Sequence, residues 1–409
     1  MDTLVATSLK DLLSKQGRRD PYPFYAALHR AGPVCRLPAH ERFDLVVHGY
    51  DAVHKVMRDS AFRVMDTEYP DRRGVPWSEH PALRTLTRSV FFTDGPDHQR
   101  VRRLFGQVFT PRRIAALEPV IVRTIEALLD RLADLGAGGA PVDFLAEFAL
   151  PLPSNVIGEL LGVPEEDRAW FPPRVRAFGA ILDLGTGAWH GLRAADIAAE
   201  ELTGYFADLV ASRRARPRDD LVSALVQAQA EGAELPDAEL LANLITMFNA
   251  GFVTTTHMIG NGLTLLLERP AVRRGLLAEP DRVPACVEEI LRYEAPVQFS
   301  IRWAGRDTEL AGVPVAAGTR VLVLYGAANR DPARFADPDR FDPSRVDNQH
   351  ASFGSGLHYC LGAALSRHEG QLALPMLLRR FPGLVLAGPP GARDKLMLRG
   401  YDSLPVRVT

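Results

Sequence analysis

The chain has 409 residues, of which 46% are hydrophobic and 24% are charged, and its formal net charge is −2. Such a balanced charge creates no global field for nucleic acid, and the composition is ordinary for a globular enzyme with a large core. The three cysteines, Cys35, Cys286 and Cys360, lie far apart, which argues against a disulfide framework and favours a reducing cytoplasm.

The N-terminal residues 1–10 contain no apolar run flanked by basic residues, so we predict neither a signal peptide nor a membrane anchor. The protein is therefore expected to be soluble and cytoplasmic. Two short apolar runs, residues 34–37 and 43–47, predict strands, and residues 50–58 predict a helix that follows them. A small N-terminal sheet is the expected result.

The middle of the chain is predicted to be helical, because residues 111–210 repeat apolar side chains at a spacing of three and four. Residues 235–237, Leu-Pro-Asp, begin a long central helix, which Arg269-Pro270 end. Residues 240–267 carry no charge over a length that could span a bilayer. Polar residues such as Asn243 and His257 favour a buried helix over a membrane span.

In the C-terminal part, residues 283–293 predict a helix, and residues 309–315 and 320–324 predict strands joined by turns. The sequence has no internal repeat, no low-complexity tract and no linker long enough to separate domains. We therefore predict a single domain over residues 1–409 that is mainly α with small β-sheets.

One cysteine lies in a glycine-rich segment, residues 352–362, which reads SFGSGLHYCLG. Gly354 and Gly356 allow a tight turn and a close approach of the backbone to a ligand. Because strong helix formers follow Cys360, its sulfur is expected at a helix N-terminus that favours a thiolate, which suits an axial haem ligand. A buried cysteine in a tight turn is the alternative, and zinc bound by His358 and Cys360 would lack further ligands.

The pattern Phe353-Gly-x-Gly-x-His358-x-Cys360-x-Gly362 resembles the haem-binding loop of the cytochrome P-450 superfamily, and the resemblance covers roughly residues 20–409. It implies the cytochrome P-450 fold with haem b (iron protoporphyrin IX) and Cys360 as the iron ligand. It also implies dioxygen activation with electrons from NAD(P)H. Since the chain has no fused flavin or iron–sulfur segment, separate ferredoxin and ferredoxin reductase are the expected partners, and Arg103, Arg112 and Arg113 are candidates for a basic docking face.

The resemblance also assigns haem-contacting and structural roles to other positions. His98 and Arg102, four residues apart on one helix, would bind the haem propionates together with Arg302 and His358. The loop residues expected to contact the cofactor are Phe353, Gly354, His358, Cys360 and Gly362. A buried structural triad is expected from Glu289, Arg292 and Arg340.

The central helix carries the catalytic residues that the resemblance implies, Ala250, Gly251 and Thr254. The small residues leave room for dioxygen, and Thr254 offers a hydroxyl that can hydrogen-bond to it. The family pattern has an acid directly before this threonine, where this chain has Val253. Three interpretations remain: the substrate relays protons, an ordered water chain does so, or the reaction differs from plain hydroxylation.

The substrate pocket can be predicted only by position, in segments 77–92, 178–189, 247–254, 297–300 and 400–401, and is expected to be mostly apolar. Its predicted residues are Phe248, Phe252, Val253, Val297, Gln298, Phe299 and Tyr401, with Gln298 and Ser300 as polar anchors. The predicted function is hydroxylation, epoxidation or oxidative coupling of a small molecule, free or tethered to a carrier protein, in secondary-metabolite biosynthesis. The alternatives are a haem enzyme that uses peroxide or nitric oxide, and a non-catalytic haem sensor or recruitment protein.

Overall fold

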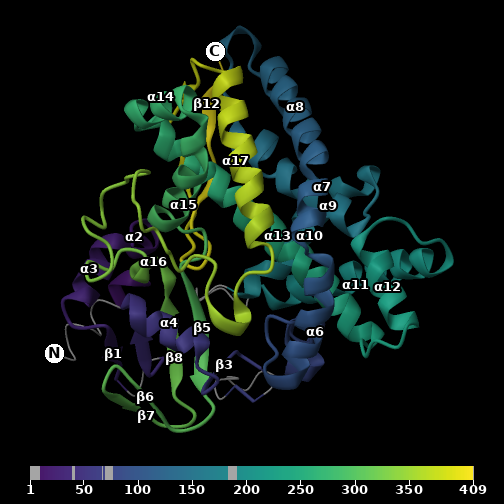
Figure 1. Cartoon of the computed structure of the whole chain (residues 1–409), viewed down its shortest axis with the longest axis vertical. Coiled ribbons are helices and arrows are strands. Elements are labelled where there is room, and N and C mark those ends of the chain that lie inside the picture. The colour runs from purple at the N-terminus through teal and green to yellow at the C-terminus, as the bar shows by residue number, and fades with distance from the viewer. Residues whose placement is uncertain (1–9, 39–41, 67, 70–76, 183–190, 409) are drawn as a thin grey trace. The chain divides into compact units, whose positions relative to one another are not determined.

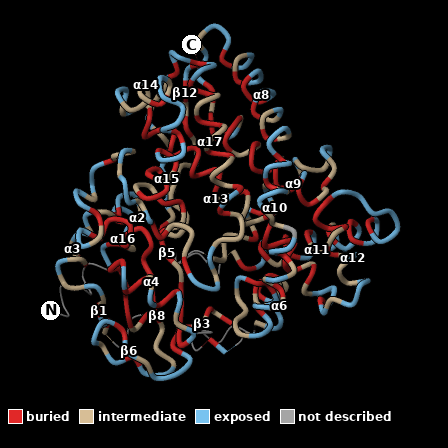
Figure 2. The backbone as a smooth tube through the Cα atoms, viewed as in Figure 1, coloured by how far each residue is buried: buried red, intermediate tan, exposed pale blue. Residues whose placement is uncertain are grey.

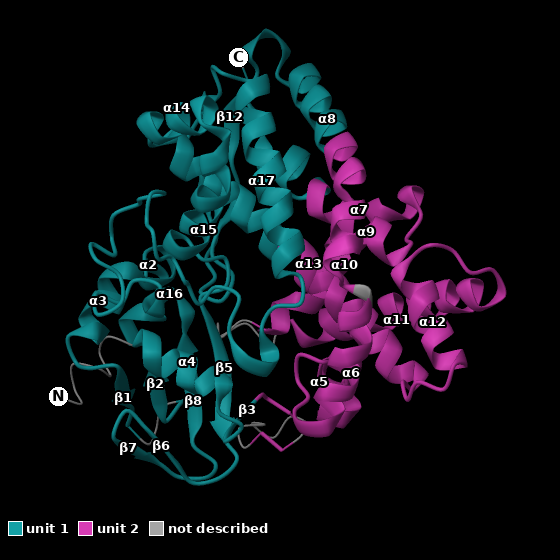
Figure 3. Ribbon diagram, viewed as in Figure 1, with its two compact units in different colours: residues 1–63, 125–151, 254–409 teal, residues 64–124, 152–253 magenta. Residues whose placement is uncertain are grey.

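The structure is a computed structural model that describes residues 10–38, 42–66, 68–69, 77–182 and 191–408. The predictions for residues 1–9 and for residues 183–189 of the substrate-facing segments lie outside this range. The chain forms two compact units (Figure 3). Unit 1 comprises Met1–Arg63, Ile125–Pro151 and Thr254–Thr409, and unit 2 comprises Val64–Thr124 and Leu152–Val253. The single-domain organisation stays a prediction.

Unit 1 contains a five-stranded sheet in the order β1-β2-β8-β5-β3 (Figure 1). β8 pairs in parallel with β2 and antiparallel with β5, so it lies at the centre of the sheet. Its residues Val321–Leu324 are all buried, as expected of a strand covered on both faces. The strands are β1 (Val34–Arg36), β2 (Leu45–Val47), β3 (Phe62–Arg63), β5 (Phe299–Ala304) and β8 (Arg320–Leu324).

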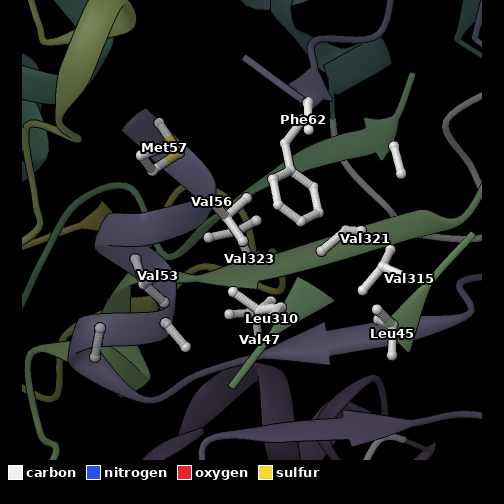
Figure 4. Close-up of a cluster of buried hydrophobic side chains, with 14 of the residues drawn as sticks. Leu45, Val47, Val53, Val56, Met57, Phe62, Leu310, Val315, Val321 and Val323 are labelled. Carbon is white, nitrogen blue, oxygen red and sulfur yellow. The ribbon is translucent and has the colours of Figure 1, made fainter. Parts of the chain in front are cut away.

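Helix α4 (Tyr50–Arg58) packs on this sheet through an apolar face (Figure 4). Val53, Val56 and Met57 recur at three- and four-residue spacing, so they share one side of the helix. They contact buried residues of β2 and β8, among them Val47 and Val323. The N-terminal strands and the helix predicted from the sequence are therefore confirmed.

The other α-helices described in unit 1 come from the N-terminal and C-terminal parts of the chain. They are α2 (Lys15–Arg19), α3 (Tyr22–His29), α14 (Pro270–Ala278), α15 (Val283–Tyr293), α16 (Tyr325–Ala328) and α17 (Ala363–Arg380). The predicted helix over residues 283–293 is confirmed as α15. The remaining strands are β4 (Val142–Asp143), β6 (Thr308–Leu310), β7 (Val313–Val315), β9 (Val385–Leu386), β10 (Gly391–Ala392), β11 (Tyr401–Ser403) and β12 (Pro405–Arg407).

Unit 2 is helical, and stacked aromatic rings form part of its core. Phe171 lies 4.2 Å from Phe248 and 5.7 Å from Phe206 between ring centroids. Its helices are α5 (Pro81–Thr87), α6 (Gly95–Val108), α7 (Pro111–Ala116), α9 (Pro151–Leu161), α10 (Phe171–Gly179), α11 (Leu192–Ala215) and α12 (Leu221–Ala230), with α8 (Glu118–Leu135) divided between the units.

The central helix α13 extends from Asp237 to Leu267 without interruption, as the sequence predicts. Pro236 precedes it, and Pro270 begins the next helix after it. Residues 237–253 belong to unit 2 and residues 254–267 to unit 1. Among the described residues, no helix combines the length and the apolar character needed to cross a membrane.

Candidate functional site

The cysteine loop is a tight backbone turn directly before α17. Gly354 and Gly356 have φ values of +67° and +68°, in the left-handed region that other residues rarely adopt. At Gly356 a Cβ atom would collide with the carbonyl oxygen of Met57 on α4. The Cys360 N–H donates to the Phe353 carbonyl oxygen at 2.9 Å, which closes the turn. The two glycines are therefore required by the path of the chain.

The three cysteines differ in their environment. Cys35 and Cys286 are buried, and burial raises the pKa of their thiols to about 11 and about 12. Both thiols are therefore protonated at neutral pH and unsuited to binding a metal as thiolates. Cys360 is partly exposed at the N-terminal side of an 18-residue helix. Of the three cysteines, Cys360 is therefore the one best suited to bind a haem iron as a thiolate.

Arg302 provides a second observation that fits haem. It lies on β5 with 8% of its surface exposed, and its Nη1 donates to the neighbouring Ile301 carbonyl oxygen at 2.8 Å. Within the described part of the chain, no carboxylate forms an ion pair with it. A buried guanidinium is costly without a negative partner, and a haem propionate is an anion of the required kind.

The predicted propionate-binding residues are divided between the two units. Arg302 and His358 belong to unit 1, whereas His98 and Arg102 belong to unit 2. His98 is 1% exposed and lies one helical turn before the half-buried Arg102 on α6. The structure thus places each pair within its own unit, and their joint binding of one haem stays a prediction.

The predicted oxygen-binding residues coincide with the accessible stretch of α13 (Figure 2). From residue 242 to residue 266 the helix is buried except at five positions, Asn249, Ala250, Gly251, Val253 and Thr254. A Cβ at Gly251 would lie 3.3 Å from the Ile157 side chain, so a larger residue would crowd the neighbouring helix α9. The five partly exposed positions therefore include all three residues that the sequence predicts to be catalytic.

The predicted charge triad is present in part. Arg292 donates two hydrogen bonds to Glu289, at 2.7 and 2.8 Å, and both side chains are fully buried. The side chain of Arg340 does not join them, because it is 69% exposed and lies 3.7 Å from Asp342. Arg345 instead places its Nε 3.3 Å from Glu289. The third member is therefore Arg345, and the prediction of Arg340 was wrong.

Two of the predicted pocket residues are used in internal packing. Both groups of the Gln298 amide are occupied, since Oε1 accepts from the Tyr25 hydroxyl at 2.9 Å and Nε2 donates to the Ala295 carbonyl oxygen at 2.6 Å. Gln298 is fully buried, so it does not anchor a substrate. The Phe248 ring stacks on Phe171 in the core of unit 2, and its role as a pocket residue stays a prediction.

The other predicted pocket residues differ in exposure. Phe299 and Phe252 are 1% and 3% exposed, whereas Val253, Val297 and Tyr401 are half-buried. Burial raises the pKa of the Tyr401 hydroxyl. The half-buried residues remain predicted pocket residues.

Two features of unit 1 were missed in the sequence. One is a second ion pair, in which Arg367 of α17 binds Glu288 of α15. The pair Glu288-Glu289 was the signal available in the sequence. Neighbouring residues of a helix point in different directions, so the two carboxylates need separate partners. The other is Glu369, a 2% exposed carboxyl group with no hydrogen-bonding partner at Oε2 among the described residues. No local pattern marks a glutamate as buried.

Comparisons with known proteins agree with this geometry. A family model described as Cytochrome P450 matches residues 10–389. The chain is 36% identical over 414 residues to 6-deoxyerythronolide B hydroxylase of Saccharopolyspora erythraea, with 98% of this chain and 99% of that protein covered. It is 37% identical over 394 residues to Cytochrome P450 monooxygenase PikC of Streptomyces venezuelae, with 95% and 91% covered. A crystal structure of P450BioI with a fatty-acid-ligated acyl carrier protein is similar at a TM-score of 0.88 and 33% identity, covering 96% of this chain and 99% of that one.

Proposed function

Because this chain belongs to the cytochrome P450 family and is a haem-dependent monooxygenase, we propose that it hydroxylates, epoxidises or oxidatively couples a small molecule during secondary-metabolite biosynthesis. The observation that carries the proposal is the half-buried Thr254, which belongs to the partly exposed stretch 249–254 of the central helix. The relative named 6-deoxyerythronolide B hydroxylase supports a tailoring reaction. Separate ferredoxin and ferredoxin reductase are the proposed electron donors.

In this proposal the residues of the chain hold the cofactor and control protons. Bound haem supplies the iron at which dioxygen is activated. Cys360 would bind the iron through its sulfur, while Arg302 and His358, with His98 and Arg102, would neutralise the propionates. The hydroxyl group of Thr254 would donate a hydrogen bond to dioxygen.

Val253 determines how protons reach the reaction. Valine has no proton to give, and the position is half-buried, so the chain itself supplies no acid there. We propose that a hydroxyl or carboxyl group of the bound substrate relays the proton to Thr254. The substrate therefore carries such a group near the site of oxidation.

The relay can be tested with Val253→Glu. An acid at this position would replace the contribution of the substrate, so turnover of substrate analogues that lack the hydroxyl or carboxyl group should become better coupled to electron consumption. The measurement is the ratio of product formed to NADPH consumed, with Val253→Leu as the control for side-chain size. Unchanged coupling for both the substrate and its analogues would contradict substrate-assisted protonation.

The substrate class can be tested by absorbance titration of the ferric protein. Candidate ligands are aromatic acids, macrolactones, terpenes and peptides, each free and tethered to a carrier protein. A substrate that displaces water from the iron shifts the spin state, and we expect one class bearing an acid or hydroxyl group to do so. A response to tethered compounds alone would assign an assembly-line substrate. Product formation with peroxide but not with dioxygen and redox partners, or tight binding without turnover when redox partners are present, would contradict the proposed monooxygenation.

A further inference from the structure

A second charge network lies beside the cysteine loop, separate from the contacts of Glu289. Arg367 on α17 binds Glu288 on α15 with two hydrogen bonds, from Nε to Oε1 at 2.7 Å and from Nη2 to Oε2 at 2.9 Å. Burial alone would raise the pKa of Glu288, but hydrogen bonds from His350 and Arg367 outweigh it and lower the pKa to about 2. Glu288 is therefore ionised at neutral pH and binds the guanidinium through two parallel hydrogen bonds.

The remaining groups of Arg367 reach both sides of the cysteine loop. Its Nη1 donates to the Tyr359 hydroxyl at 3.1 Å, and its guanidinium carbon lies 4.4 Å from the centre of the Phe353 ring. Tyr359 directly precedes Cys360, and Phe353 accepts the Cys360 N–H through its carbonyl oxygen. Arg367 thus contacts both the residue before Cys360 and the residue whose carbonyl oxygen accepts the Cys360 N–H.

His350 connects the same network to the start of the loop. Its Nδ1 accepts the Ser352 N–H at 3.2 Å, so Nε2 carries the proton that it donates to Glu288, also at 3.2 Å. The side chain is 2% exposed, and its ring lies 5.7 Å from that of Phe353. Ser352 in turn donates its hydroxyl to the Leu291 carbonyl oxygen on α15 at 2.7 Å. The loop is therefore tied to α15 on one side and to α17 on the other.

The inner network around Glu289 contacts a different set of residues. Arg292 donates to the carbonyl oxygens of Asn329, Pro338 and Arg340, which precede the cysteine loop in the chain. None of its hydrogen bonds reaches residues 353–362. Arg292 thus reaches the loop only through Asn329, whose amide donates to the Ser352 hydroxyl at 2.8 Å, whereas Glu288 binds Arg367, which contacts Phe353 and Tyr359 directly.

We propose that Arg367 is a positioning residue for Cys360, and that the network of Glu288, His350 and Arg367 keeps the sulfur in place as the iron ligand. The inference rests on the proposed role of Cys360 and adds three residues to it. Without Arg367, Tyr359 and Phe353 lose a shared partner, and the loop relies more on its glycine turns and on backbone hydrogen bonds such as those donated by Gly354, Tyr359 and Cys360. The sulfur would then be held less firmly in the position of an iron ligand.

The test uses the haem-loaded protein and its variants Arg367→Gln and Arg367→Lys. The readout is the Soret band of the reduced carbon-monoxide complex, whose position distinguishes a thiolate from a neutral axial ligand. In mild urea, loss of the thiolate-ligated form should be about tenfold faster for Arg367→Gln than for the wild type. Lysine keeps the charge but cannot form the planar fork, so Arg367→Lys should be intermediate. The haem-to-protein ratio at the start should be unchanged.

The matched control is Arg380→Gln, near the end of the same helix. Arg380 is 51% exposed and lies 3.2 Å from Asp130, far along the chain from the loop, so its variant should decay at the wild-type rate. Tyr359→Phe removes one hydroxyl and leaves the ion pair intact, so it tests the loop contact even if Arg367→Gln fails to fold. Tyr359→Phe should lose the thiolate-ligated form measurably faster than the wild type. If Tyr359→Phe and every Arg367 variant that folds lose this form at the wild-type rate, the inference is wrong.

Cys360→Ser separates this inference from the proposed function. If Cys360→Ser lacks the thiolate band and Arg367→Gln decays at the wild-type rate, the inference about Arg367 is wrong and the proposed role of Cys360 stands. If Cys360→Ser retains the thiolate band, both are wrong. Loss of the band in Cys360→Ser together with the faster decay of Arg367→Gln supports both.

Discussion

Glu369 shows how one buried group alters the dependence of stability on pH. Its carboxyl lies on α17 within unit 1, and Oε2 has no hydrogen-bonding partner among the described residues. The adjacent Gly370 leaves no room for a Cβ atom, which would lie 2.8 Å from the Met258 methyl group, so the helices are closely packed at this level. Burial therefore raises the pKa of Glu369 well above its usual value of 4.5.

We expect Glu369→Gln to be more stable than the wild type at alkaline pH. In the unfolded chain the carboxyl loses its proton near pH 4.5, whereas the folded protein retains it to a higher pH. The contribution of Glu369 to stability is therefore complete below pH 4.5 and is lost as the pH rises through the folded pKa. Glutamine does not ionise. The urea midpoint of Glu369→Gln should therefore fall less than that of the wild type between about pH 5 and about pH 9. Glu309→Gln, at an exposed position, is the control, and parallel pH profiles of Glu369→Gln and the wild type would contradict the assignment.

At the scale of elements, α15 connects the loops that follow the sheet. Glu289 accepts hydrogen bonds from Arg292, from the Asp342 N–H at 2.7 Å and from the Asn348 amide at 3.1 Å. Arg345 adds hydrogen bonds to the carbonyl oxygens of Ala336 and Asp337. Asp337 has a φ of +45°, so this loop contains a conformation that non-glycine residues seldom adopt. The buried Glu289 carboxylate therefore stabilises the conformation of the loop that contains Asp337.

We expect Arg345→Ala and Arg340→Ala to differ in stability. Arg345→Ala removes a 12% exposed cation from a fully buried carboxylate and should reduce the free energy of unfolding by about 3 kcal/mol. Arg340→Ala removes an exposed surface pair and should cost less than about 1 kcal/mol. Urea unfolding of the two variants provides the comparison. An equal or larger loss for Arg340→Ala would show that Arg340 is the third member of the triad.

At the scale of the whole molecule, buried histidines of unit 1 limit stability in acid. His48 is fully buried, with Nε2 3.4 Å from the Cys35 sulfur and Nδ1 3.4 Å from the His29 ring nitrogen Nδ1. Burial and the neighbouring His29 lower the pKa of His48 to about 3. The ring is therefore neutral in the folded protein over most of the acid range.

We expect His48→Gln to reduce the sensitivity of the protein to acid. The unfolded chain binds a proton at His48 below about pH 6.5, whereas the folded protein does so only near pH 3. The stability contributed by His48 is present above pH 6.5 and is lost as the pH falls toward 3. Thermal unfolding between about pH 6.5 and about pH 4 should therefore show a shallower decline for His48→Gln. An unchanged slope would mean that His48 is already protonated in the folded protein.

The sequence alone determined the features that depend on local spacing and on residue type. The limits of α4 and α15, the strands around residues 34–47 and 320–324, and the central helix followed from apolar periodicity and from the positions of proline. The cysteine loop and the family were recognisable because glycine, histidine and cysteine occur there at a distinctive spacing. These properties depend on residues that lie close to one another in the chain.

Only the tertiary structure decided which distant groups meet. Arg340 and Arg345 lie five residues apart, and the path of the loop selects Arg345 as the partner of Glu289. Gln298 resembles a pocket residue by position, but Tyr25, 273 residues away, occupies its amide oxygen. The ion pair of Arg367 and Glu288, 79 residues apart, has the same origin. Such pairings depend on how separate elements pack, and residue spacing contains no information about them, because the charge of an arginine does not specify its partner.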